Sequence, residues 1–344
     1  MLNEEERTVL KMWLTVSFVI YSGGMAMADV QKRVLNLSDA PLSSDAPWQP
    51  RLQLHEQTFG NADRKRPVLY VHGGTFASDN SMLFKFGGVS WADELNKAGF
   101  SAWALDFAGF GGSELYPEMA NAMPTPGEPL GRAPEAARQI ERAVHAIIAE
   151  TGAERVSIIA HSWGTMPVGL FAGGHPELVG RIVLFGPVVR REILKSVPPL
   201  GPWRFLTVEE QHKRFVEDVP AGQPAVLAEA DFPVWTAVYL RADPTSSSRT
   251  PPSVKTPNGP VADIMTAWSG SLAYDPAKIK SPVAIIRGEW DSLCNDADAA
   301  WLLASLSSAL EKTDIKIPKA THLMHLETGR TALYQASIDF LKAK

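Results

Sequence analysis

The stretch Arg155-Val-Ser-Ile-Ile-Ala-His-Ser-Trp-Gly-Thr165 decides the fold. It begins as a short apolar run, passes through a turn and then begins a helix. Small residues at positions 160 and 164 flank Ser162, as a sharp strand-to-helix turn requires, because neighbouring backbone comes close there. The first is Ala160 where the usual pattern has glycine, and alanine still adds little bulk. We therefore predict that Ser162 is a nucleophile at the apex of this turn.

A serine hydroxyl becomes an effective nucleophile only when a base removes its proton, so the pattern requires a histidine later in the chain. Of the eight histidines, only His322 and His325 lie after the last predicted strand. His322 falls in the loop between that strand and the final helix, where it can reach the turn. His325 lies closer to the helix and is expected to anchor it. We predict His322 as the base.

The carboxylate that orients this histidine is expected at the end of the preceding strand. Residues 283–291, Val-Ala-Ile-Ile-Arg-Gly-Glu-Trp-Asp, supply a strand, a glycine turn and an acid. Asp291 is the predicted carboxylate. Glu289 lies nearer the turn, and Asp296 and Asp298 are typical of the first turn of a helix. The resulting order of serine, acid and histidine along the chain differs from the other two common triad orders.

Two backbone segments are expected to stabilise an oxyanion. The helix that begins at Trp163 directs free N–H groups toward the serine, so the Trp163 amide is one predicted donor. The second is expected from Val71-His-Gly-Gly-Thr75, a glycine-rich turn directly after an apolar strand. We favour the amide of Gly74, with Thr75 second. The side chain of His72 is expected to brace the loop.

The rest of the chain from residue 52 onward alternates short β-rich runs with helical patterns. Expected strands lie at 68–71, 102–105, 155–160, 181–185, 283–287 and 314–317. Expected helices lie at 90–98, 134–150, 163–173, 296–310 and 331–341. Such alternation is typical of the α/β class, with a mostly parallel central sheet flanked by helices.

The stretch 190–280 breaks this alternation, since it is rich in proline and has no clear buried strand. We interpret it as a helical cap inserted into a core formed by residues 29–189 and 281–344. Its aromatic residues predict either an apolar substrate chamber or the small core of the cap itself. The aromatic candidates for substrate binding are Trp203, Trp235, Tyr239 and Trp268.

The composition limits the kinds of molecule that the chain is expected to bind. The chain of 344 residues has a net charge of −5 and no Lys/Arg run, which makes nucleic acid a poor candidate partner. The single cysteine, Cys294, excludes an internal disulfide, and it is expected to be a small buried residue. No Cys/His cluster has zinc-ligand spacing, so we expect neither metal nor cofactor. A small-molecule substrate is the expected partner, and the sequence carries no signal for an oligomeric state.

The N-terminal residues 1–28 resemble an export signal. An apolar stretch at 12–22 is followed by Ala26-Met-Ala28, which suits signal cleavage, and predicts a periplasmic or secreted protein. Against this, residues 4–6 are all glutamate, whereas export signals favour a positive start. The run is too short to span a bilayer, which needs about 20 apolar residues, so no stable membrane span is expected. A wrongly extended start or a membrane-surface helix are the alternatives, and without a signal the protein would be cytoplasmic.

With these motifs in place, the sequence resembles the α/β-hydrolase superfamily, in its branch of capped esterases and C–C bond hydrolases. The likeness covers residues 67–340 except the cap. It includes Leu105-Asp-Phe-Ala-Gly-Phe-Gly-Gly-Ser113, which is similar to the family's Asp-x-x-Gly-x-Gly-x-Ser loop. The resemblance implies that this loop is structural, so Asp106 is not a catalytic candidate. Dehalogenases and epoxide hydrolases of the family carry aspartate where this chain has Ser162, which disfavours both chemistries.

The predicted reaction is acyl transfer through an acyl-enzyme. An apolar or aromatic carboxylic ester is the favoured substrate, because the cap is aromatic and lacks an obvious cluster of cations. The same triad would serve a C–C bond hydrolase, an amidase or an acyltransferase. The fold can also act as a ligand-binding protein without turnover, against which the intact candidate triad argues.

Overall fold

The computed structural model describes residues 31–37, 49–60 and 62–343. The predicted signal peptide, residues 1–28, lies outside the described residues, so export stays a prediction. Within the described part of the chain, no helix has the length and hydropathy needed to cross a membrane.

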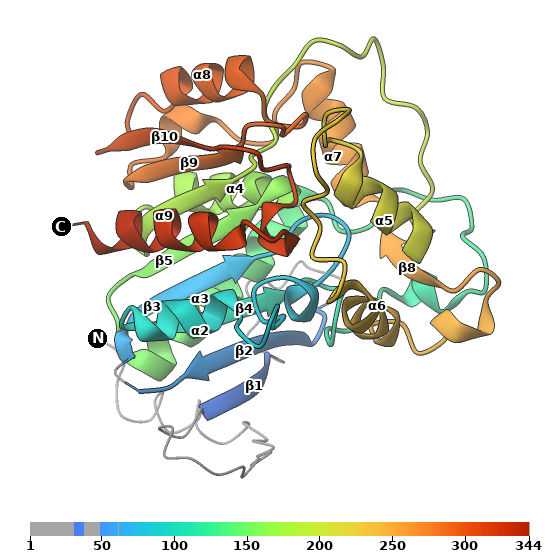
Figure 1. Cartoon of the computed structure of the whole chain (residues 1–344), viewed down its shortest axis with the longest axis horizontal. Helices are drawn as coiled ribbons and strands as arrows, with labels where there is room; N and C mark the ends of the chain where they lie inside the picture. The colour runs from blue at the N-terminus through green and yellow to red at the C-terminus, as the bar shows by residue number, and fades with distance from the viewer. Residues whose placement is uncertain (1–30, 38–48, 61, 344) are drawn as a thin grey trace.

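The core of the fold is an eight-stranded sheet of order β1-β2-β4-β3-β5-β6-β9-β10 (Figure 1). Strand β2 pairs antiparallel with both of its neighbours, and every other pair is parallel. The mostly parallel sheet predicted from the sequence is therefore confirmed. Its strands are β1 (Gln31–Leu37), β2 (Leu52–Thr58), β3 (Asp63–Val71), β4 (Phe100–Asp106), β5 (Val156–His161), β6 (Val179–Phe185), β9 (Val283–Gly288) and β10 (Lys312–Ile317).

Side-chain alternation along the strands builds two separate cores, one on each face of the sheet. In β3, Val68 and Tyr70 join one hydrophobic cluster, whereas Leu69 and Val71 join the other. This is the two-residue period of a strand that is buried on both faces. The helices that cover the first face are α2 (Trp91–Lys97) and α9 (Arg330–Lys342), and those that cover the second are α3 (Ala133–Thr151), α4 (Thr165–Gly174) and α8 (Asp296–Ser305).

Two local expectations are corrected. Helix α8 ends at Ser305 instead of continuing to residue 310, because Leu306 leaves helical geometry and buries its side chain in the core. Strands β1 and β2 were not among the expected strands. The polar sequence of β2, Leu-Gln-Leu-His-Glu-Gln-Thr, hides the pattern, because several of its polar side chains are buried against α2 and the end of β4.

The segment between β6 and β9, here called the insertion, lies on the right of Figure 1, at the end toward which β3 points. Its elements are β7 (Trp203–Thr207), α5 (Val208–Val216), α6 (Phe232–Arg241), β8 (Ser253–Pro257) and α7 (Gly259–Trp268). The insertion contains the helices that the sequence predicted, but it also contains two strands that were not expected, since β7 and β8 pair antiparallel. Both strands are short and lie far apart in the sequence, so no local pattern reveals their pairing.

The insertion contacts the core near its start and through α7. Near its start, Arg191 forms an ion pair with Asp298 of α8. In α7, the Asp263 carboxylate accepts from the Trp163 indole at 2.9 Å and from the Ala133 amide at 2.7 Å. Asp263 also forms an ion pair with Arg132. These contacts join α7 to the start of α3 and to Trp163, the residue after Ser162.

The sheet face covered by α2 and α9 gives a stability prediction. The Trp91 ring is fully buried, stacks on Tyr334 with centroids 4.9 Å apart and donates to Ser337 Oγ at 3.2 Å. Trp91→Ala is expected to lower the free energy of unfolding by about 3–5 kcal/mol, because it leaves a large cavity. Urea unfolding measures this. The control Leu310→Ala, at an 81% exposed side chain, is expected to change it by less than about 0.5 kcal/mol. Equal effects in the two variants would contradict the packing described.

Candidate active site

Three buried side chains form a hydrogen-bonded chain at the carboxyl edge of the sheet. The Ser162 hydroxyl donates to His322 Nε2 at 2.8 Å, and His322 Nδ1 lies 3.1 Å from both carboxylate oxygens of Asp291. With a neutral imidazole, this arrangement leaves Nε2 free to accept the serine proton. Ser162 follows β5, Asp291 follows β9 and His322 follows β10, so three parallel strands deliver the three groups to one edge.

The residues that the sequence left as alternatives lie elsewhere. The Glu289 carboxylate accepts from the Lys319 amide at 2.9 Å, and Asp296 forms ion pairs with Arg287 and Lys316. Asp298 forms an ion pair with Arg191 and caps the start of α8, as expected of a first-turn acid. The structure therefore brings together Ser162, Asp291 and His322 and separates them from the other carboxylates considered.

The turn at Ser162 is strained in the way that the sequence predicted. Ser162 has φ of +55°, a left-handed conformation that side chains other than glycine rarely adopt. A Cβ placed on Gly164 would lie 2.4 Å from the His72 carbonyl oxygen, so only glycine fits there. A Cβ on Gly73 would lie 3.2 Å from Ser162 Cβ. The glycines of the elbow and of the His-Gly-Gly turn are thus needed for the same close approach.

The carboxylate of Asp291 is held from two sides. Its Oδ1 accepts from the amides of Leu293 and Cys294, both at 2.9 Å. On the other side lies Gly186, which has φ of +53°. A Cβ there would be 2.9 Å from His322 Nδ1 and 3.0 Å from Asp291 Oδ2. Sequence reasoning missed Gly186, although a glycine directly after a buried parallel strand was a usable signal.

Cys294 is buried, as predicted, and burial raises the pKa of its thiol. A thiol that is hard to ionise is a poor nucleophile. Its role here is structural, through the amide that it donates to Asp291.

Three further histidines surround the site and remain neutral. His72 Nδ1 donates to the Gly73 carbonyl at 2.7 Å, and His72 Nε2 accepts from the Phe107 amide at 3.1 Å, so it braces the loop as expected. Burial lowers the pKa of His72 and, to a much greater extent, that of His161. Burial and the neighbouring His322 lower the pKa of His325 to about 3, and neither of its ring nitrogens bonds to a described residue.

The aromatic candidates of the insertion are mostly packing residues. Trp203, Trp235 and Tyr239 are buried, and their polar tips donate to the carbonyls of Glu118, Asn80 and Leu206 at 3.0, 2.8 and 3.0 Å. The Arg191 guanidinium lies over the Trp268 ring, 5.2 Å from its centroid. These contacts support the alternative that the rings are packing residues, although two of them pack against the core, at Glu118 and Asn80, and not within the insertion alone. Their contact with substrate stays a prediction.

Two arginines of the insertion, by contrast, are brought near the glycine turn. Arg214 Nη1 donates to Thr75 Oγ1 at 2.7 Å, and Gln211 donates to the Thr75 carbonyl at 3.3 Å. Arg204 Nη1 donates to Asn258 Oδ1 at 2.6 Å. The sequence showed no cluster of cations here, because the two arginines lie ten residues apart on consecutive elements, Arg204 on β7 and Arg214 on α5.

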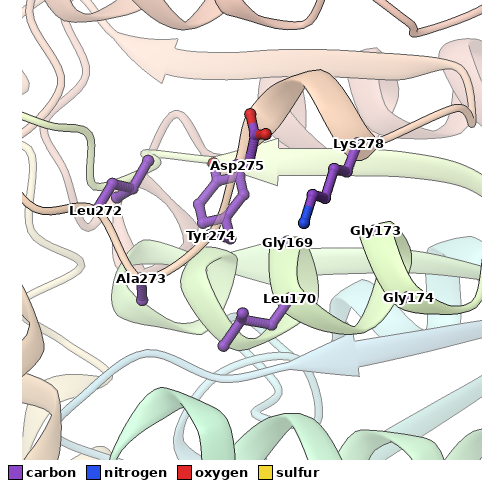
Figure 2. Close-up of a pocket in the computed structure, with 9 residues that line it drawn as sticks. All are labelled: Gly169, Leu170, Gly173, Gly174, Leu272, Ala273, Tyr274, Asp275 and Lys278. Atoms are coloured by element: carbon purple, nitrogen blue, oxygen red, sulfur yellow. The ribbon is translucent and has the colours of Figure 1, made fainter.

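A pocket of about 410 Å³ lies away from this site. Figure 2 shows that it is bounded by α4, at Gly169, Leu170, Gly173 and Gly174, and by the segment 272–278 that follows α7. None of the three hydrogen-bonded residues lines it. It is therefore distinct from the place where a group bound to Ser162 would lie.

Comparison with known proteins identifies the family of the chain. A family model described as alpha/beta hydrolase fold matches residues 66–328. The chain belongs to the α/β-hydrolase fold family. No curated protein sequence matches this α/β-hydrolase.

Several solved structures share the fold of this α/β-hydrolase at low sequence identity. A membrane phospholipase A described as a bacterial virulence factor matches with a TM-score of 0.58 and 18% identity, over 92% of this chain and 87% of that one. The 2-hydroxy-6-oxo-6-phenylhexa-2,4-dienoate hydrolase of Rhodococcus sp. strain RHA1 gives 0.57 and 16%, over 92% and 100%. Est1E from Butyrivibrio proteoclasticus with bound ferulic acid gives 0.53 and 14%, over 85% and 94%.

The loop that carries His322 is closed by a buried carboxylate that sequence reasoning missed. Glu327 Oε1 accepts from the Thr321 amide at 3.1 Å and from the Thr321 hydroxyl at 2.5 Å. Thr321 directly precedes His322, so this contact fixes the start of the loop. Burial raises the pKa of Glu327 to about 7, even though both bonds from Thr321 oppose the shift.

This raised pKa predicts a pH-dependent stability. Below pH 4.5 the carboxyl is protonated in both the folded and the unfolded chain, and it has no effect. Between pH 4.5 and 7 it ionises only when unfolded, so the folded state loses stability as pH rises, by about 3 kcal/mol in total. Glu327→Gln keeps an oxygen acceptor for Thr321 and removes the ionisation.

Urea unfolding at pH 5 and at pH 8 is the measurement. Glu327→Gln is expected to gain stability relative to the unsubstituted protein at pH 8 and much less at pH 5. The control Glu289→Gln, at a carboxylate that accepts from a backbone amide in a more exposed position, is expected to show no such gain at pH 8. A gain at pH 5 as large as that at pH 8 would contradict a raised pKa.

Proposed function

We propose that this α/β-hydrolase is a serine hydrolase that cleaves carboxylic esters through an acyl-enzyme. The observation that carries the proposal is the 2.8 Å contact between Ser162 and His322 together with the contact between His322 and Asp291. His322 takes the serine proton as Ser162 attacks the ester carbonyl, and Asp291 orients the imidazole and stabilises its charged form. His322 then protonates the leaving alcohol, and water releases the acid by the same steps.

The oxyanion of the tetrahedral intermediate would be held by the amides of Trp163 and Gly74. Trp163 is the first residue after the strained serine, where helix N–H groups have no intrahelical acceptor. A Cβ on Gly74 would lie 3.7 Å from Trp163 Cβ, so the two backbones run close together. Thr75, the other candidate, has its carbonyl and hydroxyl engaged by α5, which supports a positioning role for it.

The insertion would act as a cap over this centre. Pro260 in α7 packs directly against the glycine turn, since a Cβ on Gly74 would lie 2.8 Å from Pro260 Cβ. The Asp263 carboxylate also binds the Trp163 indole. Because export through residues 1–28 is part of the same proposal, the enzyme would act in the periplasm or outside the cell.

C–C bond cleavage, amide cleavage and acyl transfer to an alcohol use the same three groups and are the alternative reactions. The names of the structural relatives, which include a dienoate hydrolase and a phospholipase A, span such a range. Ester cleavage is favoured because it needs no group beyond the triad and the two amides. Product analysis, with and without an added acceptor alcohol, distinguishes these reactions.

A serine variant tests the proposal. Ser162→Ala is expected to lower kcat for any ester turned over by at least about a thousand-fold, since the nucleophile is removed. A panel of esters, lactones and amides, together with labelling by a fluorophosphonate probe, provides the measurement. The control Ser305→Ala, at a helix serine that bonds to the Trp301 carbonyl, is expected to keep full activity and labelling.

Equal hydrolysis by the unsubstituted protein and Ser162→Ala would exclude the proposed nucleophile. Absence of both turnover and probe labelling would favour a ligand-binding protein without catalysis.

A glycine variant tests the geometry. Gly186→Ala is expected to lower kcat by about a hundred-fold, because a Cβ at this position displaces His322 from Asp291 and Ser162. The matched control is Gly152→Ala, which has a similar left-handed φ of +67° but open space around the new Cβ. Both variants lose stability through backbone strain, whereas only Gly186→Ala loses activity. Equal kcat values in the two folded variants would show that Gly186 does not determine the position of the triad.

A further inference from the structure

Two arginines of the insertion carry positive charge without a carboxylate partner. Among the described residues, neither Arg204 nor Arg214 forms an ion pair, and their hydrogen bonds go only to Asn258, Thr75 and Gln211, which are neutral. Burial lowers the pKa of both guanidinium groups. Removing a guanidinium from water without a counter-charge is unfavourable, so proteins normally pair it.

Other arginines in the same part of the molecule are paired. Arg249 of the insertion binds Asp243, and Arg191 at its base binds Asp298. The acids nearest to Arg214 are Glu217 and Asp218, which favour its charge from beyond ion-pair distance. Glu210 likewise favours the charge of Arg204 without forming an ion pair with it. The Glu210 carboxylate accepts instead from the amide and hydroxyl of Thr207 at the start of α5. Arg241 also has no ion pair among the described residues, but it is exposed, whereas Arg204 and Arg214 are half-buried.

Both guanidinium groups have further donors. Each donates through Nη1 only. Both side chains are partly exposed. The charge of Arg214 also lowers the pKa of Arg204, so the two groups lie within electrostatic range of each other. An anion that entered from solvent could bind to both.

The position of the pair connects it to the reacting centre. Arg214 binds the side chain of Thr75, the residue after the proposed oxyanion donor Gly74. Arg204 binds Asn258, two residues before Pro260, and a Cβ on Gly74 would lie 2.8 Å from Pro260 Cβ. Arg214 therefore contacts the turn at which the ester carbonyl would sit, and Arg204 binds the segment that packs on that turn.

We propose that Arg204 and Arg214 bind an anionic group on the substrate, so that the enzyme acts on esters that also carry a carboxylate or a phosphate. The inference rests on the proposed ester hydrolysis and names its substrate class. This anionic substrate class replaces the apolar or aromatic ester that the sequence predicted. That prediction rested on the aromatic residues of the insertion, and three of them, Trp203, Trp235 and Tyr239, are buried in packing contacts. Two guanidinium groups bind a carboxylate or a phosphate through charge-assisted hydrogen bonds.

Matched substrates test this directly. Three substrates share the 4-nitrophenyl leaving group and differ in charge. They are the 4-nitrophenyl monoester of glutaric acid, the same compound with its free carboxylate methylated, which is neutral, and the 4-nitrophenyl ester of 3-phosphonopropionic acid. We expect kcat/KM for one of the two anionic esters to exceed that for the neutral ester by at least about ten-fold, with a preference that falls as salt is added. The anionic ester that is preferred identifies carboxylate or phosphate as the group bound.

Arginine variants test the residues. Arg204→Met and Arg214→Met are each expected to lower kcat/KM for the preferred anionic ester about 10- to 100-fold and for the neutral ester less than about three-fold. Arg214→Lys keeps the charge and is expected to recover part of the loss. The control Arg241→Met removes an exposed arginine of α6 and is expected to alter neither substrate.

The outcomes separate this inference from the proposed function. Hydrolysis of the neutral ester that equals or exceeds that of both anionic esters overturns the inference and leaves ester hydrolysis intact. An equal loss for all three esters in the methionine variants also overturns it, because the cations would then support the oxyanion instead.

If the methionine variants do not fold, inhibition provides the test. Glutarate or 3-phosphonopropionate is expected to compete with the neutral ester in the unsubstituted enzyme, and lack of inhibition by both contradicts the inference. If no ester is hydrolysed at all, the proposed function fails. In that case, thermal stabilisation of Ser162→Ala by glutarate or 3-phosphonopropionate would still support an anion site. If neither anion stabilises the variant, the inference is overturned.

Discussion

The left-handed backbone at Ser162 is the constraint on which the rest of the site depends. A serine with φ of +55° at the end of β5 is held there only because the surrounding chain leaves no alternative. Gly164 lies against the carbonyl of His72, and Gly73 lies against the Ser162 side chain. The elbow and the His-Gly-Gly turn are therefore one packed unit. Any side chain added at either glycine would move the serine away from His322, the proposed base.

The parallel sheet brings Asp291 and His322 to the same edge as Ser162. Because β5, β9 and β10 run in the same direction, their following loops meet at one edge. Gly186 leaves room there for His322 and Asp291, and Glu327 binds Thr321, the residue before His322. The surroundings are electrostatically suitable as well. Burial lowers the pKa of His161 and His325, which favours their neutral forms, so in the proposed proton transfer the charge on His322 would meet no second imidazolium nearby.

The sequence predicted those parts of the structure that have a local signature. Buried strands read as apolar runs, the elbow as small residues around Ser162, and the triad acid and base as residues just after strands. Several features had no such signature. They are the pairing of β7 with β8, which joins distant segments, the acceptor role of Glu327, and the contact between Arg214 and Thr75. The insertion was accordingly the least predictable part of the chain.

The contacts between insertion and core suggest how recognition and catalysis are connected. Asp263 binds the indole of Trp163, Pro260 packs on Gly74, and Arg214 binds Thr75. Each contact ends on, or next to, a residue whose amide is proposed to hold the oxyanion. A substrate group that binds to the insertion therefore acts on the same rigid unit that stabilises the transition state, and its binding energy can be expressed in kcat as well as in KM. An insertion joined only to the outer surface of the core would be limited to an effect on binding.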